Sequence, residues 1–186
     1  MSCDPSGTFA SVVGYFNFGP SQNGSAQFSG HRLASNGYMD AFVALYDSSG
    51  ECQWAKGAGG QSMDEAHGIA ISSTAIFVTG LFSGTAQFGG DTIFTAASSD
   101  AFVSCYSYSG QSLWTSNLGV FANGSAVGYA VSLDQQGRPI AVGGFEHGFS
   151  VPGQGINTSH GGYDMFAVGY DQAAGTVVWS KCYGGT

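Results

Sequence analysis

Three aspartates stand at the same place in three similar segments of the chain, and carboxylates brought together could bind a cation or move a proton. Asp40 begins Asp-Ala-Phe-Val-Ala-Leu-Tyr, Asp100 begins Asp-Ala-Phe-Val-Ser-Cys-Tyr, and Asp164 begins Asp-Met-Phe-Ala-Val-Gly-Tyr. An aspartate present in every copy where a strand begins is more economically a cap, because its carboxylate accepts hydrogen bonds from backbone N–H groups of the preceding turn. We predict that all three are structural anchors.

The histidines lack the spacing of metal ligands. They are His31, His67, His147 and His160. Neither His-x-His nor His-Glu-x-x-His occurs among them. Asp64, Glu65 and His67 could donate to a metal, and Glu146 lies beside a histidine, but each site would need ligands from other parts of the fold. We therefore predict no metal ion and no cofactor.

Motifs of enzyme active sites are also missing from the sequence. There is no Gly-x-Ser-x-Gly elbow and no Asp-x-Asp-x-Asp-Gly calcium loop. The Gly-rich run at 57–60 is not followed by Lys-Ser or Lys-Thr, so we predict a turn there rather than a phosphate-binding loop. These patterns predict no catalytic residue and no enzyme. Paired acids from different segments, as in glycoside hydrolases, remain an open alternative.

Four cysteines are spread along the chain with no Cys-x-x-Cys pair, which excludes a local zinc ribbon or thioredoxin-like motif. They are Cys3, Cys52, Cys105 and Cys182. In an oxidising compartment they could form two disulfides, and otherwise they serve as small buried hydrophobic residues. If the chain closes a ring, its ends meet, and we predict a disulfide between Cys3 and Cys182.

Three asparagines fit the N-glycosylation acceptor pattern. They are Asn23, Asn123 and Asn157. The pattern arises often by chance in a chain rich in serine, so surface glycans and plain turns both stay open.

Composition excludes several partners. Only 9% of the 186 residues are charged and the net charge is −8, so the chain cannot assemble the cluster of cations that a nucleic acid or an anionic membrane needs. No run of 18 apolar residues occurs, and the segment after Met1 has no basic or apolar leader pattern. With its weakly charged Ser, Thr and Gly surface, the chain is expected to be extracellular or at the cell surface, with its leader absent here.

The three aspartate segments belong to a longer internal repeat. They are offset by 60 and 64 residues, and each is followed by a glycine and then a tryptophan. The tryptophans are Trp54, Trp114 and Trp179. We predict that these are buried packing residues and that a single domain, 1–186, holds repeats at about 1–64, 65–125 and 126–186.

Each repeat is predicted to supply four strands. Large apolar residues on both faces of segments such as 101–106 suit a sheet covered on both sides. An extra hairpin is expected around Ala-Gln-Phe in the first two repeats, at 24–28 and 84–88. The strands at 67–71 and 127–131 have no counterpart before Val12. The expected fold is all-β, with tandem four-stranded antiparallel blades of a β-propeller.

The pattern resembles the SBBP-type β-propeller repeat of bacterial and archaeal extracellular proteins. Trp54-Ala-Lys56 with Gly59-Gly60 matches that repeat, as does Trp179-Ser-Lys181 with Gly184-Gly185, whereas Trp114-Thr-Ser116 departs from it. The resemblance implies a secreted or surface scaffold with no fixed catalytic residues.

Three blades are fewer than the four to eight of closed propellers, and an open sheet edge favours pairing with another chain. We therefore expect a non-enzymatic extracellular structural or adhesion module that associates with itself, as a closed ring or as a filament. A carbohydrate-binding module, with exposed aromatic residues stacking on glycans, is the alternative. A polysaccharide hydrolase or lyase is the third possibility.

Overall fold

The computed structural model describes residues 1–17, 24–95, 97–120 and 124–185, and every helix or strand element within them is a β-strand. All pairs of named strands run antiparallel. The all-β antiparallel class predicted from the sequence is therefore confirmed.

Each repeat forms a sheet of four strands that lie side by side in chain order. Those of repeat 1 are β1 (Ser2–Cys3), β2 (Phe9–Asn17), β5 (Met39–Asp47) and β6 (Cys52–Gly60). Those of repeat 2 are β7 (Asp64–Ile71), β8 (Ala75–Phe82), β11 (Asp100–Ser107) and β12 (Ser112–Val120). Those of repeat 3 are β13 (Ser125–Leu133), β14 (Pro139–Glu146), β17 (Asp164–Tyr170) and β18 (Val177–Tyr183).

A short hairpin is inserted between the second and third strands of every repeat, where the sequence predicted an extra hairpin for the first two. The hairpins are β3 (Ser25–Phe28) with β4 (His31–Ala34), β9 (Thr85–Phe88) with β10 (Asp91–Phe94), and β15 (Gly148–Val151) with β16 (Gly155–Thr158). The second hairpin pairs with the end of β6 and the third with the end of β12. Each of these two hairpins thus extends the sheet of the preceding repeat.

Repeat 1 does have a strand before Val12, so the predicted absence was wrong. Ser2 and Cys3 pair with Ser11 and Ala10. Between the paired segments the chain turns at Asp4, whose carboxylate accepts a hydrogen bond from the backbone N–H of Phe9 at 2.7 Å. A strand of two residues carries no alternation of apolar and polar positions, and for this reason the sequence pattern did not indicate it.

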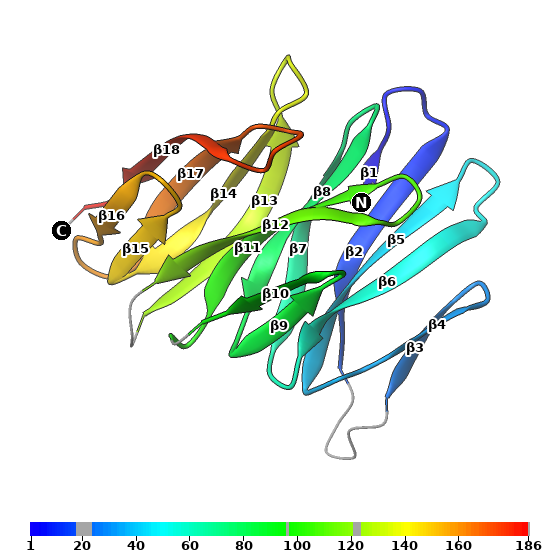
Figure 1. Cartoon of the computed structure of the whole chain (residues 1–186), viewed down its shortest axis with the longest axis horizontal. Coiled ribbons are helices and arrows are strands. Elements are labelled where there is room, and N and C mark those ends of the chain that lie inside the picture. The colour runs from blue at the N-terminus through cyan, green and yellow to red at the C-terminus, as the bar shows by residue number, and fades with distance from the viewer. Residues whose placement is uncertain (18–23, 96, 121–123, 186) are drawn as a thin grey trace.

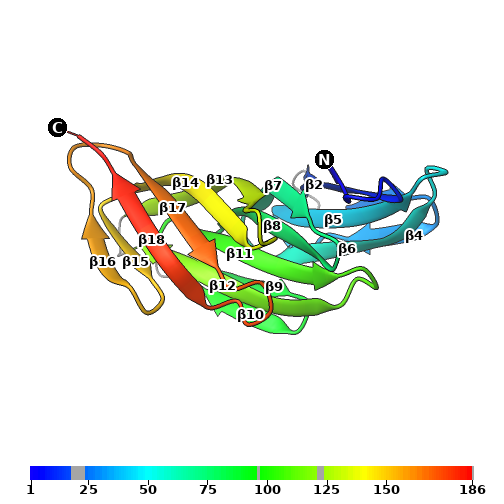
Figure 2. The same cartoon turned by 90° about the horizontal axis from the view of Figure 1, so that it is seen from above.

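The three sheets follow one another in a row, with the inserted hairpins along one side (Figure 1). The view from above shows an elongated molecule whose described strands do not close into a ring (Figure 2). The inner strands of neighbouring repeats approach closely, since a Cβ added to Gly68 in β7 would lie 2.7 Å from the Cα of Ala130 in β13. Glycine is required there because the two backbones leave no room for a side chain.

The core lies mainly between the sheets. In β11, Phe102 and Tyr106 join a buried cluster that extends into repeat 1, whereas Ala101 and Val103 on the other face join a cluster that extends into repeat 3. This two-sided burial agrees with the pattern predicted for 101–106. A sheet is buried on both faces only when another repeat packs on each side. Repeat 2 lies between two repeats, whereas repeats 1 and 3 each have one neighbouring repeat among the described residues and one outer face.

The predicted disulfide between Cys3 and Cys182 is not formed, because the chain ends lie apart in an open row instead of meeting in a ring (Figure 2). All four cysteines are free thiols. Cys52 and Cys105 are buried, and burial raises the pKa of the Cys105 thiol to about 12. These two match the alternative interpretation as small buried hydrophobic residues.

Candidate functional site

The three repeated aspartates are buried at the beginning of the third strand of each repeat. The carboxylate of Asp40 accepts hydrogen bonds from the backbone N–H of Asn36 at 2.8 Å and from the hydroxyl of Ser35 at 2.5 Å. Asp164 accepts one from the backbone N–H of His160 at 2.8 Å. These bonds confirm the predicted capping role for Asp40 and Asp164, and burial keeps all three carboxylates away from a substrate in solvent.

The Gly-rich run at 57–60 is part of strand β6 and not the turn predicted from the sequence. A Cβ on Gly59 would overlap the carboxylate of Asp40, and a Cβ on Gly184 would overlap that of Asp164. Gly119 holds the same position in repeat 2, and a Cβ added to it would lie 3.3 Å from the carboxylate of Asp100. The glycine five residues after each tryptophan therefore makes room for the capping aspartate.

One further carboxylate, Asp64, which the sequence offered only as a possible metal donor, is fully buried. It accepts hydrogen bonds from the backbone N–H groups of Gly60 at 2.8 Å and Ser83 at 3.4 Å. Burial raises its pKa to about 7, and the negative charge of Asp40 adds to the increase. One carboxylate oxygen of Asp40, Oδ1, is buried and has no hydrogen-bond partner in the part of the chain that the structure describes. The two acids form a buried pair at the junction of repeats 1 and 2.

The repeated tryptophans join each repeat to the next one. Trp54 donates a hydrogen bond from its indole N–H to the backbone carbonyl of Tyr108 at 2.8 Å, and its ring lies 6.4 Å from that of Tyr106. The ring also covers Gly110, whose φ is +78° and whose added Cβ would lie 2.9 Å from the indole. We call this combination of a tyrosine, a carbonyl two residues later and a covered glycine the tryptophan seat.

Trp114 occupies a second seat in repeat 3. Its indole N–H donates to the carbonyl of Gln172 at 3.0 Å, its ring stacks on Tyr170 at 5.7 Å, and it covers Gly175. Trp54 is buried, Trp114 and Trp179 are half-buried, so the prediction of buried tryptophans holds fully only for the first. The seats use residues of different repeats, which the sequence pattern alone could not bring together.

The histidine and glutamate candidates for metal binding are engaged in other contacts. His67 lies 2.8 Å from the carboxylate of Glu65 and 3.1 Å from the carbonyl of Gly128. Glu146 accepts a hydrogen bond from Ser125 at 3.0 Å. Within the described ranges, no three His, Cys, Asp or Glu side chains are grouped as metal ligands would be.

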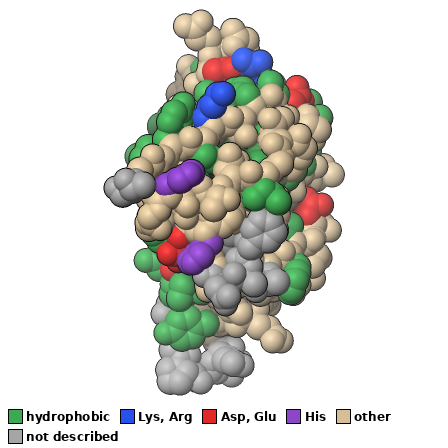
Figure 3. Space-filling view, turned by 90° about the vertical axis from the view of Figure 1, so that its left-hand side faces the viewer, with side chains coloured by type: hydrophobic (Ala, Val, Ile, Leu, Met, Phe, Trp, Pro, Cys, Tyr) green, Lys and Arg blue, Asp and Glu red, His purple; other side chains and the backbone are tan. Residues whose placement is uncertain are grey.

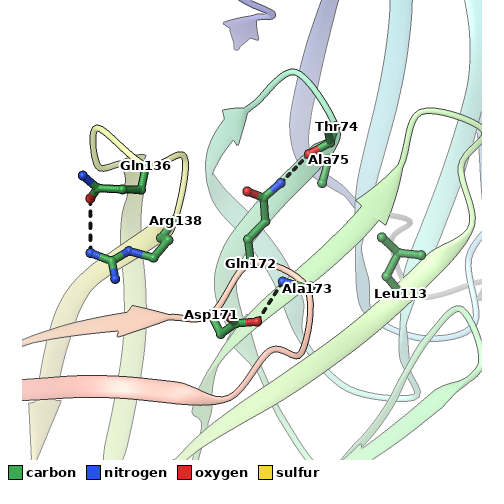
Figure 4. Close-up of a pocket in the computed structure, with 8 residues that line it drawn as sticks. All are labelled: Thr74, Ala75, Leu113, Gln136, Arg138, Asp171, Gln172 and Ala173. Carbon is green, nitrogen blue, oxygen red and sulfur yellow. Dashed lines mark hydrogen bonds between the residues drawn. The ribbon is translucent and has the colours of Figure 1, made fainter.

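A hollow opens at the junction of repeats 2 and 3, beside the seat of Trp114 (Figure 4). Its lining residues are Thr74, Ala75, Leu113, Gln136, Arg138, Asp171, Gln172 and Ala173. The Gln172 side chain donates to Thr74, and the Arg138 guanidinium donates to Gln136 at 3.3 Å (Figure 4). The Arg138 guanidinium also donates to Asp134 at 2.7 Å. Because these polar groups bond to one another, the hollow resembles a structural junction more than a binding site.

Two exposed tyrosines lie together on repeat 3. Tyr129 is 55% exposed and Tyr163 is 53% exposed, and a Cβ added to Gly144 would contact both rings, at 3.3 and 3.0 Å. The Tyr163 hydroxyl shares a hydrogen bond with Ser125 at 2.5 Å. Of the three glycosylation candidates, Asn157 is half-buried in β16, while Asn23 and Asn123 lie outside the described residues.

Comparison with known proteins adds no relative. No family model matches the chain, and no curated protein matches it. Among the described residues, no helix has the length and apolar character to cross a bilayer.

Proposed function

We propose that this chain is a non-enzymatic structural or adhesion module of the cell exterior, built of propeller-type blades, that assembles with itself through the two ends of its row. The outer face of repeat 3 and the outer face of repeat 1, here called the tail face and the head face, are the surfaces involved. Support comes from comparing each end face with its counterparts in the covered repeats.

The observation that carries the proposal is the exposure of apolar side chains on the tail face. Met165 is 64% exposed, whereas its counterparts Ala41 and Ala101 are 2% and 0% exposed. Tyr183 is 61% exposed, whereas Ala58 and Leu118 at the same position are 7% and 0% exposed. Positions that the internal junctions bury are thus uncovered at the end of the row, and contiguous exposed apolar surface is a mark of an interface.

The tail face also carries little charge to oppose association. Figure 3 views the molecule from this side, and only a few of its side chains are acidic or basic. The whole chain has only 9% charged residues, but its net charge of −8 gives copies a like-charge repulsion, which salt would screen.

The expected result is self-association of the 186-residue chain. Its mass by light scattering should rise with concentration over a hundredfold range around the micromolar region. Met165→Lys should weaken association, because a charge would be buried without a partner. Phe94→Lys is the matched control, since Phe94 is also 64% exposed but lies in repeat 2, away from the end faces. A monomer mass at every concentration would overturn the proposal.

Carbohydrate binding is a second candidate, supported by the exposed pair of Tyr129 and Tyr163. Aromatic rings that stay exposed in pairs can stack on sugar rings. If this function holds, the protein should bind specific glycans on an array, and Tyr163→Ala should abolish the signal while leaving the melting temperature unchanged. An array without signal would remove this candidate.

A further inference from the structure

The contacts at the two internal junctions show which groups the head face and the tail face could bind. At each junction, a tryptophan of one repeat occupies the seat of the next repeat, and an inserted hairpin of the next repeat pairs with the last strand of the first. The following inference rests on the proposed self-association and specifies its geometry, including which face meets which.

The seat of repeat 1 is complete but has no tryptophan in it. By position, its residues are Tyr46, the carbonyl of Ser48, and Gly50, corresponding to Tyr106, Tyr108 and Gly110 of repeat 2. Gly50 has a φ of +84°, close to the +78° of Gly110, so the turn has the same form. Among the described residues, no atom lies within 4 Å of a Cβ added to Gly50, in contrast with the indole that covers Gly110.

The exposure of the seat tyrosine shows the same difference. Tyr106 and Tyr170 are 2% and 1% exposed under the tryptophans that cover them, whereas Tyr46 is only half-buried. An indole ring stacked on Tyr46, in the way that Trp114 stacks on Tyr170, would cover the exposed part of Tyr46.

Trp179 of repeat 3 is the tryptophan without a seat. It pairs with Gly169 as Trp54 pairs with Leu45, so it holds the same position in its sheet. It is half-buried, and no described residue accepts a hydrogen bond from its indole N–H, although the other two indoles both donate to a seat carbonyl.

The head face and the tail face also each have half of the contact between an inserted hairpin and the last strand of the preceding repeat. In the first internal junction Gly59 and Gly60 pair with Gln87 and Ala86 of β9. These glycines lie five and six residues after Trp54, and the residues five and six after Trp179 are again glycines, at 184–185. The matching hairpin residues in repeat 1 are Gln27 and Ala26, within Ser-Ala-Gln-Phe of β3.

Burial of the hairpin side chains supports this assignment. Ala86 is 0% exposed and Phe88 is 1% exposed, because the preceding repeat covers them. Ala26 and Phe28, at the same positions of β3, remain partly exposed. The hairpin β3–β4 forms a separate two-stranded sheet, whereas its two counterparts each extend the sheet of a preceding repeat.

We propose that the tail face of one copy binds the head face of a second copy of this chain in the arrangement of the internal junctions. Trp179 enters the seat formed by Tyr46, Ser48 and Gly50, and its indole N–H donates to the Ser48 carbonyl. The end of β18, through 184–185, pairs with β3 of the same neighbour. One orientation of the second copy produces both contacts. The pairing of β18 with β3 through main-chain hydrogen bonds is β-strand addition.

The interface is heterologous, since different surfaces meet. Such contacts produce a closed ring if the rotation between copies closes and a filament if it does not. Two copies would place six repeats in one ring, within the four to eight of closed propellers.

The test uses one variant for each face and then their mixture. Trp179→Ala removes the tail contact, and Ala26→Arg blocks the hairpin on the head face with a charge. Each variant alone should remain monomeric at concentrations where the wild type associates, with an apparent dissociation constant raised about 30-fold or more, as for an interface hot spot. Val178→Ala, beside Trp179 and 49% exposed, is the control that should associate as the wild type does.

An equimolar mixture of the two variants should form a dimer, because the first retains its head face and the second retains its tail face. If Ala26→Arg dimerises alone, the contact is tail to tail and the inference is overturned. It is also overturned if the mixture stays monomeric while both variants keep the wild-type melting temperature and circular dichroism spectrum. If the wild type associates and both variants do so equally well, self-association stands and this geometry fails. A monomeric wild type would overturn both.

Discussion

Replacing Trp54 by alanine is expected to lower the free energy of unfolding by about 3 to 5 kcal/mol, the range for truncation of a large aromatic residue in a core. Trp54 is 8% exposed and belongs to the cluster that joins repeats 1 and 2. Its removal leaves a cavity over Gly110 and takes away the hydrogen bond to the Tyr108 carbonyl. Urea denaturation followed by circular dichroism would measure the change.

Trp179→Ala is the matched control, because the same residue type at the same position has no following repeat among the described residues. Measured on the monomer, its loss of stability should be clearly smaller than that of Trp54→Ala. Trp54→Phe should recover most of the packing while losing the hydrogen bond, worth about 1 kcal/mol. Equal losses for Trp54→Ala and Trp179→Ala would show that the junction contributes nothing to the role of the tryptophan.

Local features of the fold could be predicted from the sequence because each depends on a short segment. The strands after Asp40, Asp100 and Asp164 follow from runs of apolar residues on both faces and from a repeated cap. The three inserted hairpins lie in equivalent places, although only two of them share the Ala-Gln-Phe segment. Repetition strengthened these predictions, since a weak pattern that recurs at a fixed offset is not accidental.

Features that depend on the relation between repeats could not be predicted in this way. Whether the row closes is set by the rotation from one sheet to the next, which no short motif encodes, so the link between Cys3 and Cys182 was wrong. The three tryptophans hold the same place in the repeat, but only Trp54 and Trp114 have a seat in a following repeat among the described residues. For the same reason, the sequence could not show that Trp54 and Trp114 donate to carbonyls 54 and 58 residues away.

The burial of Asp64 was not predicted, for a different reason. The repeat analysis selected residues present in every copy, and the position of Asp64 is occupied in repeat 3 by Ala126, which pairs with Phe145 as Asp64 pairs with Phe82. A carboxylic acid at a position that is apolar elsewhere is a signal of its own, because burying a charge is costly. Its effect on stability should be visible as a dependence on pH.

Asp64→Asn is expected to stabilise the protein above pH 7 and to flatten its stability profile between about pH 4 and 7. The pKa of Asp64 is about 7 in the folded protein and 3.8 in the unfolded reference, so the folded state keeps a proton that the unfolded state has lost. The free energy of unfolding therefore falls as pH rises through this window, by up to about 1.4 kcal/mol per pH unit. It changes no further through this group above about pH 7.

Thermal melts of the wild type and of Asp64→Asn at intervals from pH 4 to 8 would measure the difference, and Glu51→Gln, at an exposed turn, controls for the loss of one acidic residue. Asp4, Asp47 and Asp134 have pKa values lowered by hydrogen bonds, so the stability they contribute is lost only below about pH 4 and does not enter this window. All other ionisable groups are the same in both proteins, so their contributions cancel in the comparison. Asparagine keeps an acceptor for the Gly60 N–H and is uncharged at every pH, which isolates the charge of Asp64 as the cause. Parallel profiles for the two proteins would show that the carboxylate does not titrate near neutral pH and that the junction holds its charge without penalty.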